Sequence, residues 1–475
     1  MQAEPEVDTA LSAEDKLDFK RVLPVFVIVL VGLLGLTVII PLLPLYATSF
    51  GASPFMIGLL GATYPLMQFI AAPILGRLSD RYGRKPILIV SQIGTLIGFV
   101  LLGLANALPI LFLSRIIDGL SGANISTAQA AISDITTEKN RTQGLGLIGA
   151  AFGLGFIIGP IIAFISLALS DNNYHVPAFV AAGFSLASIL LTIFWFEETL
   201  PAERRGTTTD RPAVSFRAML DGLQHPSVGL LLFLLFAQQL AFGGFEQLLS
   251  IFTLSRLGLN ASGNAVVFVF VGLILVAVQG GLVGRWSRRY GDRRIVFAGL
   301  ALLAIGLTAV AFTPRVPPPW YSQAELEEEL NAPPEEPSVS GEPPSAVSAV
   351  SGTGSIELPS DDNTGWLGLL WILVAMIPVA IGGGMLQPTI NSLITKRVTP
   401  LEIGGILGIS AAFLSLANAI APLLAGAIFQ AVGPTALFLV WGGLMGLLYL
   451  VAVSRLRPGP EETAAPGLAP GGTAH

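Results

Sequence analysis

Long apolar runs alternate with short polar segments along the whole chain. A helix needs roughly 20 apolar residues to cross a bilayer, and each run is long enough to do so. The twelve runs are residues 22–46, 55–78, 86–105, 108–131, 142–167, 174–196, 227–254, 263–286, 294–313, 365–393, 402–430 and 434–454. We therefore predict an all-α membrane protein with twelve transmembrane helices.

The polar segments divide these runs into two sets of six. We expect a tail, a six-helix bundle, a linker, a second six-helix bundle and a second tail, at residues 1–21, 22–197, 198–226, 227–455 and 456–475. Within the second bundle, residues 314–364 contain ten acidic residues, ten prolines and one arginine. Such a composition buries too little apolar surface to fold alone. We predict a mostly disordered external loop, with a short helical turn near residues 324–330.

Basic residues gather on one side of the predicted membrane. If the N-terminus is cytoplasmic, 22 of the 25 Lys and Arg residues fall in cytoplasmic segments, and only Arg256 and Arg315 fall outside. Membrane proteins carry such an excess in their cytoplasmic loops. The acidic N-terminus lacks the basic region of a signal peptide, so the first span should be retained. We expect a multi-pass protein in the lipid bilayer of the plasma (inner) membrane, with both termini cytoplasmic.

Composition narrows the possible chemistry. The chain is 53% hydrophobic and 12% charged, whereas a soluble domain carries about 25% charged residues. It has no cysteine, and its three histidines lie in separate loops or tails, so we predict no metal site. No phosphate-binding loop, H-E-x-x-H sequence or nucleophile elbow stands in a suitable context. We expect no enzyme, no cofactor, and neither a nucleotide nor a nucleic acid as partner.

The two halves of the chain resemble each other weakly. Residues 76–85 (GRLSDRYGRK) match residues 284–293 (GRWSRRYGDR) at six of ten positions, at an offset of 208. Residues 146–160 align less closely with residues 408–422, at an offset of 262. The extra residues 314–364 account for the increase in offset. Repeated halves of this kind are typical of transporters.

The stretch 144–160 contains a G-x-G-x-x-G sequence, which in other proteins binds a dinucleotide. Here a polar loop precedes the glycines instead of a strand, and no acidic residue follows at the required distance. On a helix the small residues form two stripes on opposite faces, and such stripes let helices approach closely in lipid. We interpret the stretch as a membrane helix between two neighbours, in which Pro160 favours a bend. Tight packing alone is the alternative interpretation.

Three segments resemble the major facilitator superfamily. Residues 76–85 look like its signature loop between the second and third helices, and residues 35–44 and 115–119 (RIIDG) resemble its first and fourth helices. The resemblance covers nearly the whole chain apart from the tails and residues 314–364. It implies the major facilitator fold, in which two six-helix halves rock about a central cavity to transport a small molecule. We also expect a monomer.

A fourth segment resembles the antiporter motif of the drug:proton exchangers in that superfamily. The matching positions are Gly146, Gly155, Gly159 and Pro160, with Ala163 where the family usually has another glycine. Together with residues 115–134, this motif is most similar to the tetracycline-type branch. The resemblance implies proton-coupled efflux of small amphipathic organic compounds or drugs by alternating access.

The signature loop predicts a conformational gate at its side of the membrane. Asp80 can accept from free amides at the N-terminus of a helix across the half-to-half interface, which the resemblance places near Gly404 and Gly405. Arg84 can pair with Asp80 and with Asp134 at the end of the fourth helix. The gate residues are Gly76, Asp80, Arg81, Gly83, Arg84, Lys85 and Asp134. A basic loop that merely sets topology is the alternative.

Three ionisable residues within the apolar runs are candidates for proton coupling, because charges inside a membrane are costly and usually functional. Arg115 and Asp118 are three apart on one helix face and can interact. Glu246 lies near the middle of the seventh span without an obvious basic neighbour. We favour Glu246 as the protonation site, whereas a structural ion pair is an alternative for Arg115 and Asp118.

Polar and aromatic residues on several spans are candidates for the substrate cavity. They are Tyr64, Gln68, Asn124, Gln129, Gln238, Gln239, Phe242, Gln387 and Asn391. A mostly apolar cavity with few hydrogen-bonding groups suits amphipathic molecules better than sugars. Each of these side chains could instead satisfy a neighbouring helix.

Two other functions fit the same sequence. The fold could serve a symporter or uniporter for a nutrient such as a sugar or an organic acid. From a different class, the chain could be a membrane sensor or scaffold that does not transport and uses its acidic external loop.

Overall fold

The computed structural model describes residues 18–122, 124–136, 138–205, 216–331, 356–399 and 402–458, which form helices and no strand. Twelve spans in this part of the chain are long and apolar enough to cross a membrane, as predicted. The helices longer than ten residues are α1 (Phe19–Ile39), α3 (Pro54–Tyr82), α4 (Arg84–Gly103), α5 (Leu108–Leu120), α6 (Asn124–Ile135), α7 (Glu138–Ala168), α8 (His175–Phe194), α10 (Gly229–Leu257), α11 (Ala261–Ala277), α13 (Asp292–Ala311), α15 (Leu367–Lys396), α16 (Ile403–Val432) and α17 (Pro434–Arg455). The shorter ones are α2 (Leu43–Ser49), α9 (Phe216–Gln224), α12 (Val283–Tyr290) and α14 (Gln323–Asn331).

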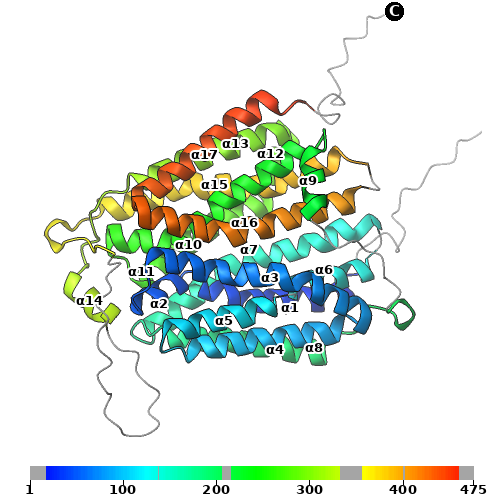
Figure 1. Cartoon of the computed structure of the whole chain (residues 1–475), viewed down its shortest axis with the longest axis horizontal. Coiled ribbons are helices and arrows are strands. Elements are labelled where there is room, and N and C mark those ends of the chain that lie inside the picture. Colours follow the sequence, from blue (N-terminus) through cyan, green and yellow to red (C-terminus); the bar gives the residue numbers. More distant parts are fainter. Residues whose placement is uncertain are drawn as a thin grey trace, which may run out of the picture.

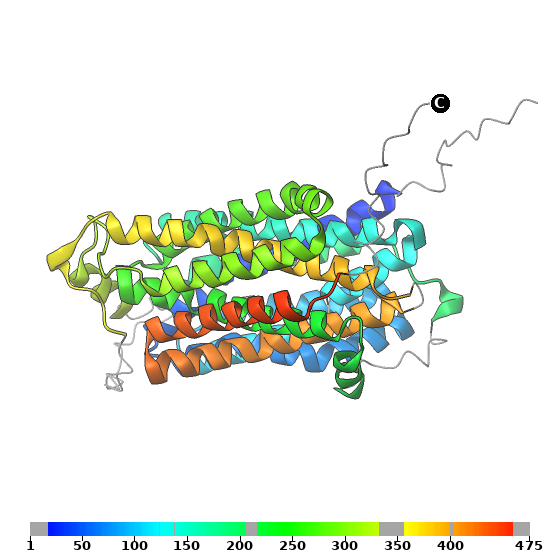
Figure 2. The ribbon, with the colours of Figure 1, turned by 90° about the horizontal axis from the view of Figure 1, so that it is seen from above.

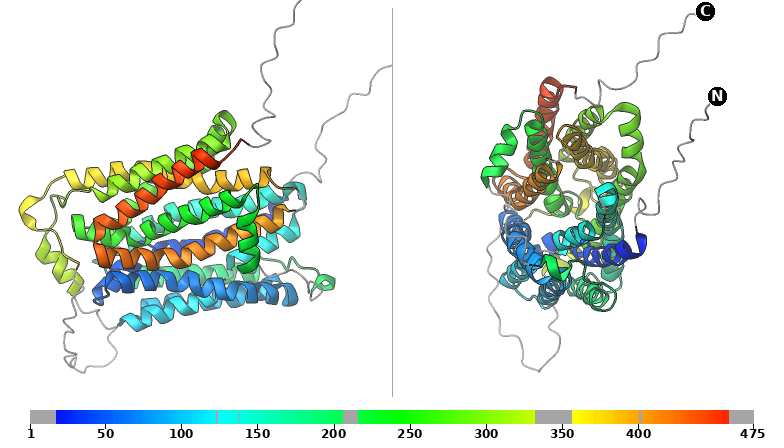
Figure 3. Two further views of the ribbon diagram at one scale, coloured as in Figure 1. Left: turned by 45° about the horizontal axis from the view of Figure 1, so that its top comes forward. Right: turned by 90° about the vertical axis from the view of Figure 1, so that its right-hand side faces the viewer.

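The long helices form two bundles that lie against each other along their length. Helices α1 to α8 make the lower bundle in Figure 1 and helices α10 to α17 the upper one, apart from α14. The view from above in Figure 2 and the end view in Figure 3 show the same division. We call the end with residues 169–174, 258–260, 312–331 and 356–366 the insert end. The opposite end, which holds residues 84, 292 and 455, is the basic end.

Three of the spans are not continuous α-helices. The first is interrupted between α1 and α2, where Pro41 lacks the amide that a helix would need, so residues 35–44 lie in the predicted first span and cover the end of α1, this break and the start of α2. The fourth breaks between α5 and α6, and the eighth contains a π-helical turn at Val278–Leu282. Breaks within membrane helices are tolerated where neighbouring groups satisfy the freed backbone.

The inserted loop is folded at both of its ends, which corrects the prediction of disorder there. Helix α14 includes the predicted turn, and Leu326 on it is only 5% exposed. The Tyr321 hydroxyl donates to the carbonyl of Pro359 at 2.8 Å, which joins the two ends of the loop. Residues 332–355 lie outside the described residues. The ends fold because the membrane bundle supplies the apolar surface that the loop lacks.

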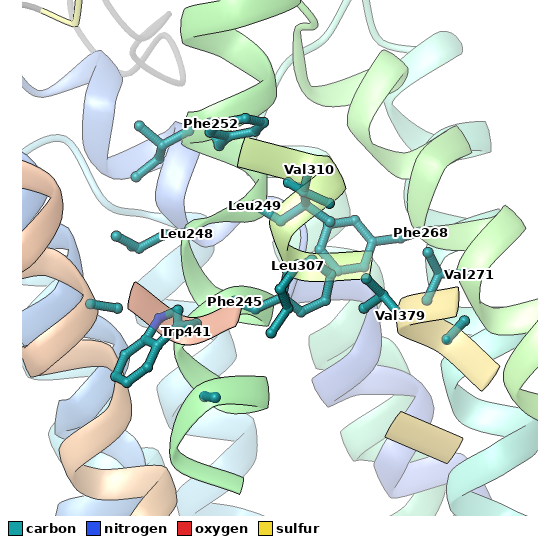
Figure 4. Close-up of a cluster of buried hydrophobic side chains, with 14 of the residues drawn as sticks. Phe245, Leu248, Leu249, Phe252, Phe268, Val271, Leu307, Val310, Val379 and Trp441 are labelled. Atoms are coloured by element: carbon teal, nitrogen blue, oxygen red, sulfur yellow. The ribbon is translucent and has the colours of Figure 1, made fainter. Parts of the chain in front are cut away.

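The main buried core includes residues of both bundles and, in the second bundle, extends as far as Leu456 at the basic end. One cluster of buried side chains includes Leu45 and Leu60 of the first bundle together with Leu248 of α10. Figure 4 shows its part in the second bundle, where side chains of α10, α11 and α13 meet Val379 of α15 and Trp441 of α17. This shared core positions the polar residues that follow.

Candidate transport site

The signature loop forms a charged cluster at the basic end of the first bundle. The guanidinium of Arg84 donates to Asp80 at 2.6 Å, to Asp134 at 2.8 Å and to Ser79 at 3.1 Å. Its side chain is 5% exposed, whereas those of Asp80 and Asp134 are 23% and 19% exposed. The structure therefore contains the predicted pairing of Arg84 with both carboxylates. The pairing ties the ends of α3, α4 and the fourth span together.

The other loop residues surround this cluster. Gly83 ends α3 with φ of +109°, a backbone region that favours glycine. Arg81 is exposed beside the ring of Tyr82, and Lys85 donates to the carbonyl of Ile193. A side chain at Gly76 would meet nothing within 4 Å. The expected cap from Asp80 to Gly404 and Gly405 stays a prediction, because the side-chain description does not extend to residue 404.

A further acid of the cluster, Glu198, escaped the sequence analysis. It follows α8 and accepts from the backbone amides of Arg84 at 2.9 Å and Lys85 at 3.1 Å. These amides begin α4 and have no partner within the helix, and the helix dipole favours an anion there. The signal in the sequence was the acidic pair 197–198 at the same membrane side as the basic loop.

The second bundle repeats the cluster with its charges exchanged. The same offsets of 208 and 262 relate Arg84 to Asp292 and Asp134 to Lys396. Asp292 accepts from Lys396 at 2.7 Å and from Ser392 at 2.6 Å, and Gly291 before it has φ of +81°. The repeat thus preserves an ion pair at corresponding positions of each half although neither residue type is preserved.

Arg115 and Asp118 form an ion pair inside the first bundle. Their charged atoms lie 3.2 Å apart, and both side chains are 2% exposed. Asp118 lines a cavity of about 50 Å³ between α1, α3, α4, the fourth span and α8. All of its lining residues belong to the first bundle, so the cavity that contains Asp118 is not the space between the halves.

Three predicted substrate residues lie at this cavity or beside it. Tyr64 and Asn124 line it, together with Gln92, which the sequence analysis did not select. Gln68 donates to the carbonyl of Gly122 at 2.7 Å. That carbonyl is freed by the break between α5 and α6, so Gln68 satisfies the backbone of a neighbouring helix, as one of the alternatives above allowed.

Glu246 lies halfway along α10, on a face that looks toward the boundary between the halves. One turn before it, Phe242 packs against Gly383 of α15, and one turn after it, Ser250 donates to the carbonyl of Pro41 in the first bundle at 3.0 Å. The adjacent Gln247 packs against Gly61 of α3. Among the described residues, the Glu246 carboxylate has neither a hydrogen bond nor a counter-ion. It is half-buried.

The remaining predicted cavity residues, Gln129 apart, belong to the second bundle. Gln239 donates to Asn418 at 2.8 Å, and Asn418, which the sequence analysis missed, is exposed midway along α16. Gln387 is exposed as well, Gln238 is buried, and the Asn391 side-chain oxygen is buried without a partner in the described residues. Exposed polar amide groups in the middle of a membrane span are costly in contact with lipid. They indicate a polar surface on the inner side of α15 and α16.

Gln129 is exposed on α6 in the first bundle. The structure therefore does not bring it together with the amides of α15 and α16 through any described contact.

The antiporter motif packs α7 between the two bundles. A side chain at Gly159 would lie 2.8 Å from the backbone carbon of Thr37 in α1, and one at Gly155 would lie 3.4 Å from Leu33. On another face of α7, Phe156 lies against Gly272 of α11. The described part thus places α7 between two neighbours, as predicted, and α7 continues through Pro160 to Ala168. The surroundings of Gly146 lie outside the described side chains.

The two halves contact each other closely at the insert end. A side chain at Gly58 of α3 would lie 3.0 Å from Gly426 of α16, and the amide of Phe55 donates to Gln430 at 3.1 Å. Toward the basic end, side chains at Gly76 of α3 and Gly405 of α16 would meet no described atom within 4 Å. The structure is therefore closed at the insert end and has free space at these positions toward the basic end.

Twelve membrane-length helices in the described part of the chain, arranged in two related halves, are typical of transporters built from structural repeats. The profile of the Major Facilitator Superfamily matches residues 25–323 and 349–473, and the chain belongs to this family. It is thus a transporter and an integral multi-pass membrane protein.

Several curated relatives are tetracycline resistance proteins. The class B protein of Escherichia coli is 33% identical over 289 residues, which cover 60% of this chain and 71% of the relative. The class C protein of the same organism is 29% identical and covers 86% and 88% of the two chains. The human Major facilitator superfamily domain-containing protein 10 is 24% identical and covers 90% and 91%.

Solved structures show the same fold. The human organic anion transporter MFSD10 aligns with a TM-score of 0.56 at 22% identity, over 91% of this chain and 99% of that one. The nucleoside transporter NupG aligns with a TM-score of 0.64 at 11% identity, over 93% and 100%.

Proposed function

We propose that this transporter exports small amphipathic organic compounds in exchange for protons. The observation that carries the proposal is Glu246, an acid inside a membrane span, at the boundary between the halves and without a counter-ion in the described structure. An ionised carboxylate is costly there unless a partner compensates its charge. A proton or a substrate can each be that partner, and their competition couples the two fluxes.

The exchange is balanced in one cycle. With the insert end open, the Glu246 carboxylate takes a proton from external water and becomes neutral. The halves then rock to the arrangement in this structure, closed at the insert end. The proton leaves to cytoplasmic water as substrate binds beside the ionised carboxylate. After the halves rock back, an incoming proton replaces the substrate, which leaves outside.

Two further features support this direction of transport. Gly155 and Gly159 of the antiporter motif lie against α1, and the motif resembles that of the drug:proton exchangers. Tetracycline resistance proteins are among the relatives. In this proposal the protein works as a monomer in the inner membrane with its basic end cytoplasmic. Because the Arg84 cluster is intact while the insert end is closed, we assign it, with the Asp292 cluster, to holding the helix ends within each half, in place of the predicted gate.

Arg115 and Asp118 have a secondary part in the proposal. Their mutual pairing already compensates both charges inside the first bundle. We assign proton exchange to Glu246. The ion pair of Arg115 and Asp118 instead sets the shape and polarity of the cavity that Tyr64 and Asn124 line.

The test is a screen in cells that lack their main efflux pumps. Cells carrying the wild type are expected to accumulate less of one or more compounds in a panel that includes tetracycline, ethidium and fluoroquinolones. The Glu246→Gln variant, which retains shape but loses the charge, should restore full accumulation. Glu203→Gln, at an exposed acid of the basic end, is the matched control. Equal export by wild type and Glu246→Gln would reject the proposal.

A further inference from the structure

Helix α14 crosses from one half of the molecule to the other at the insert end. It belongs to the inserted loop between α13 and α15 of the second bundle, yet it lies beside α2 of the first bundle (Figure 1). The first half of the chain has no counterpart to this segment between its third and fourth spans. The feature is therefore an addition to the repeated architecture and needs its own explanation.

The start of α14 is anchored to the second bundle. The backbone amide of Gln323, at the first position of the helix, donates to Asp361 at 2.8 Å, on the returning segment of the loop. Tyr321 packs on Gly258, which ends α10 with φ of +62°. From the start of α11, Asn260 donates to Glu329 at 3.1 Å. These contacts make α14 move with the second bundle.

The apolar face of α14 packs on the first bundle. Helix α14 contacts α2 directly, and Leu326, 5% exposed, belongs to the buried cluster that contains Leu43 and Tyr46 of α2 as well as Leu257 and Leu259 of the second bundle. Glu329 lies three residues later and hence on the same face. Burial, and then the charge of the nearby Glu329, raise the pKa of the phenol of Tyr174 in the loop before α8. Neither the phenol oxygen of Tyr174 nor Oε1 of Glu329 has a hydrogen-bond partner in the described structure.

We propose that α14 is a latch that holds the insert end closed, because it is fixed to the second bundle and packs through Leu326 on the first. The latch must detach each time the halves separate at the insert end. It therefore sets the fraction of molecules that are closed at that end. The proposal rests on the alternating-access cycle of the proposed function. It does not depend on proton coupling or on the identity of the substrate.

The latch responds to external pH through Glu329. Burial raises the pKa of the Glu329 carboxyl, while the hydrogen bond from Asn260 acts in the opposite direction. A raised pKa in the packed state means that packing favours the protonated form, so the latch is strongest at low pH and weakens as pH rises through that pKa. Two groups from other elements lie near Glu329, namely Asn260, which donates to it, and Tyr174. The ring of Tyr46 stacks on Tyr174 and also contacts His175. On its own helix Glu329 is accompanied by the exposed Glu325, Glu327 and Glu328.

The test measures the opening of the insert end directly. The chain has no cysteine, so spin labels on Phe55→Cys and Val432→Cys, both exposed, report one distance between the halves by pulsed electron resonance. In full-length protein in lipid nanodiscs we expect one short distance to dominate. Leu326→Asp should raise the ratio of the long to the short distance about tenfold or more. This factor corresponds to the free energy lost when a buried leucine side chain is no longer buried. Ala324→Asp places the same charge at an exposed position of α14 and should leave the distribution unchanged.

A second variant keeps the test valid if Leu326→Asp fails to fold. Glu329→Gln imitates the protonated carboxyl, so its distribution should stay at the low-pH form of the wild type as the pH rises, whereas the wild type shifts toward the long distance. The latch would be overturned if Leu326→Asp left the distance distribution unchanged. It would also be overturned if Glu329→Gln shifted the distribution to the long distance. Equal export by the wild type and Glu246→Gln, with the distance response to Leu326→Asp intact, would instead reject the proposed function alone.

Discussion

Arg84 joins several helix ends through one side chain. Its guanidinium meets two carboxylates and a serine, while the backbone amide of the same residue binds Glu198. Charge-assisted hydrogen bonds of this kind are about twice as strong as neutral ones. The residue therefore fixes the ends of three spans through contacts that the single ammonium group of a lysine could not reproduce.

We expect Arg84→Ala to destabilise the protein through this cluster. Removal of one partner of a largely buried charged pair leaves Asp80 and Asp134 uncompensated, at a cost of about 2 to 3 kcal/mol. Thermal unfolding of purified protein in detergent should show a midpoint several degrees lower. The neighbouring Arg81→Ala, which removes an exposed guanidinium, is the control. Equal midpoints for the two variants would show that the cluster contributes little.

At the scale of elements, helix α7 depends on where its glycines lie. A Cβ at Gly159 would lie 2.6 Å from Thr37 Cβ and 2.8 Å from its backbone carbon in α1, whereas a Cβ at Gly149 would meet no described atom within 4 Å. In lipid the association of helices rests on close packing of this kind, because lipid tails are as apolar as the helix surfaces and give no hydrophobic driving force. The two glycines of one helix should thus differ sharply in their tolerance of a side chain.

Gly159→Ala should be destabilising, and Gly149→Ala should be neutral. The added methyl group at position 159 forces α1 and α7 apart, with a cost of about 1 to 3 kcal/mol that is typical of overpacking. Both variants gain the same helix propensity, so the difference between their unfolding midpoints isolates the contact with Thr37. A midpoint for Gly159→Ala at or above that of Gly149→Ala would contradict the packing described here.

The spans and the signature loop could be predicted from the sequence because each depends on local pattern. Apolar runs of membrane length become helices wherever they occur, and the offsets of the internal repeat relate Arg84 and Asp134 to Asp292 and Lys396. The pairing of Arg84 with its two acids could be predicted because the signature loop and the end of the fourth helix lie on the same side of the membrane.

Contacts between distant helices could not be predicted in this way. Gln68 and Asn418 are both amides within apolar runs. Gln68 donates to the Gly122 carbonyl at the break before α6, whereas Asn418 of α16 accepts from Gln239 of α10. Only the packing of the helices decides between these outcomes. The folding of α14 likewise depends on apolar surface that the bundle supplies and the loop itself lacks.

At the scale of the whole molecule, charge distribution sets the orientation in the membrane. The basic end carries both clusters and the short loops rich in Arg, and the insert end carries the acidic loop. The positive-inside tendency predicts that the basic end faces the cytoplasm. The inserted helix α14 would then act from outside the cell.

Single cysteines in the cysteine-free chain test this orientation. In intact cells we expect Asp362→Cys, exposed at the insert end, to react with a membrane-impermeant maleimide. Glu203→Cys, exposed at the basic end, should react only after the membrane is permeabilised. The reverse labelling pattern would place the termini outside and would invert the direction of transport.

The exchange of a proton for substrate at Glu246 is the central claim, and proton movement in proteoliposomes tests it most directly. With a compound identified by the screen loaded on one side and a pH dye enclosed, substrate flux through the wild type should drive protons in the opposite direction. Glu246→Gln should abolish that proton flux while Glu203→Gln preserves it. Substrate flux that proceeds at the wild-type rate without any accompanying proton movement would contradict the account.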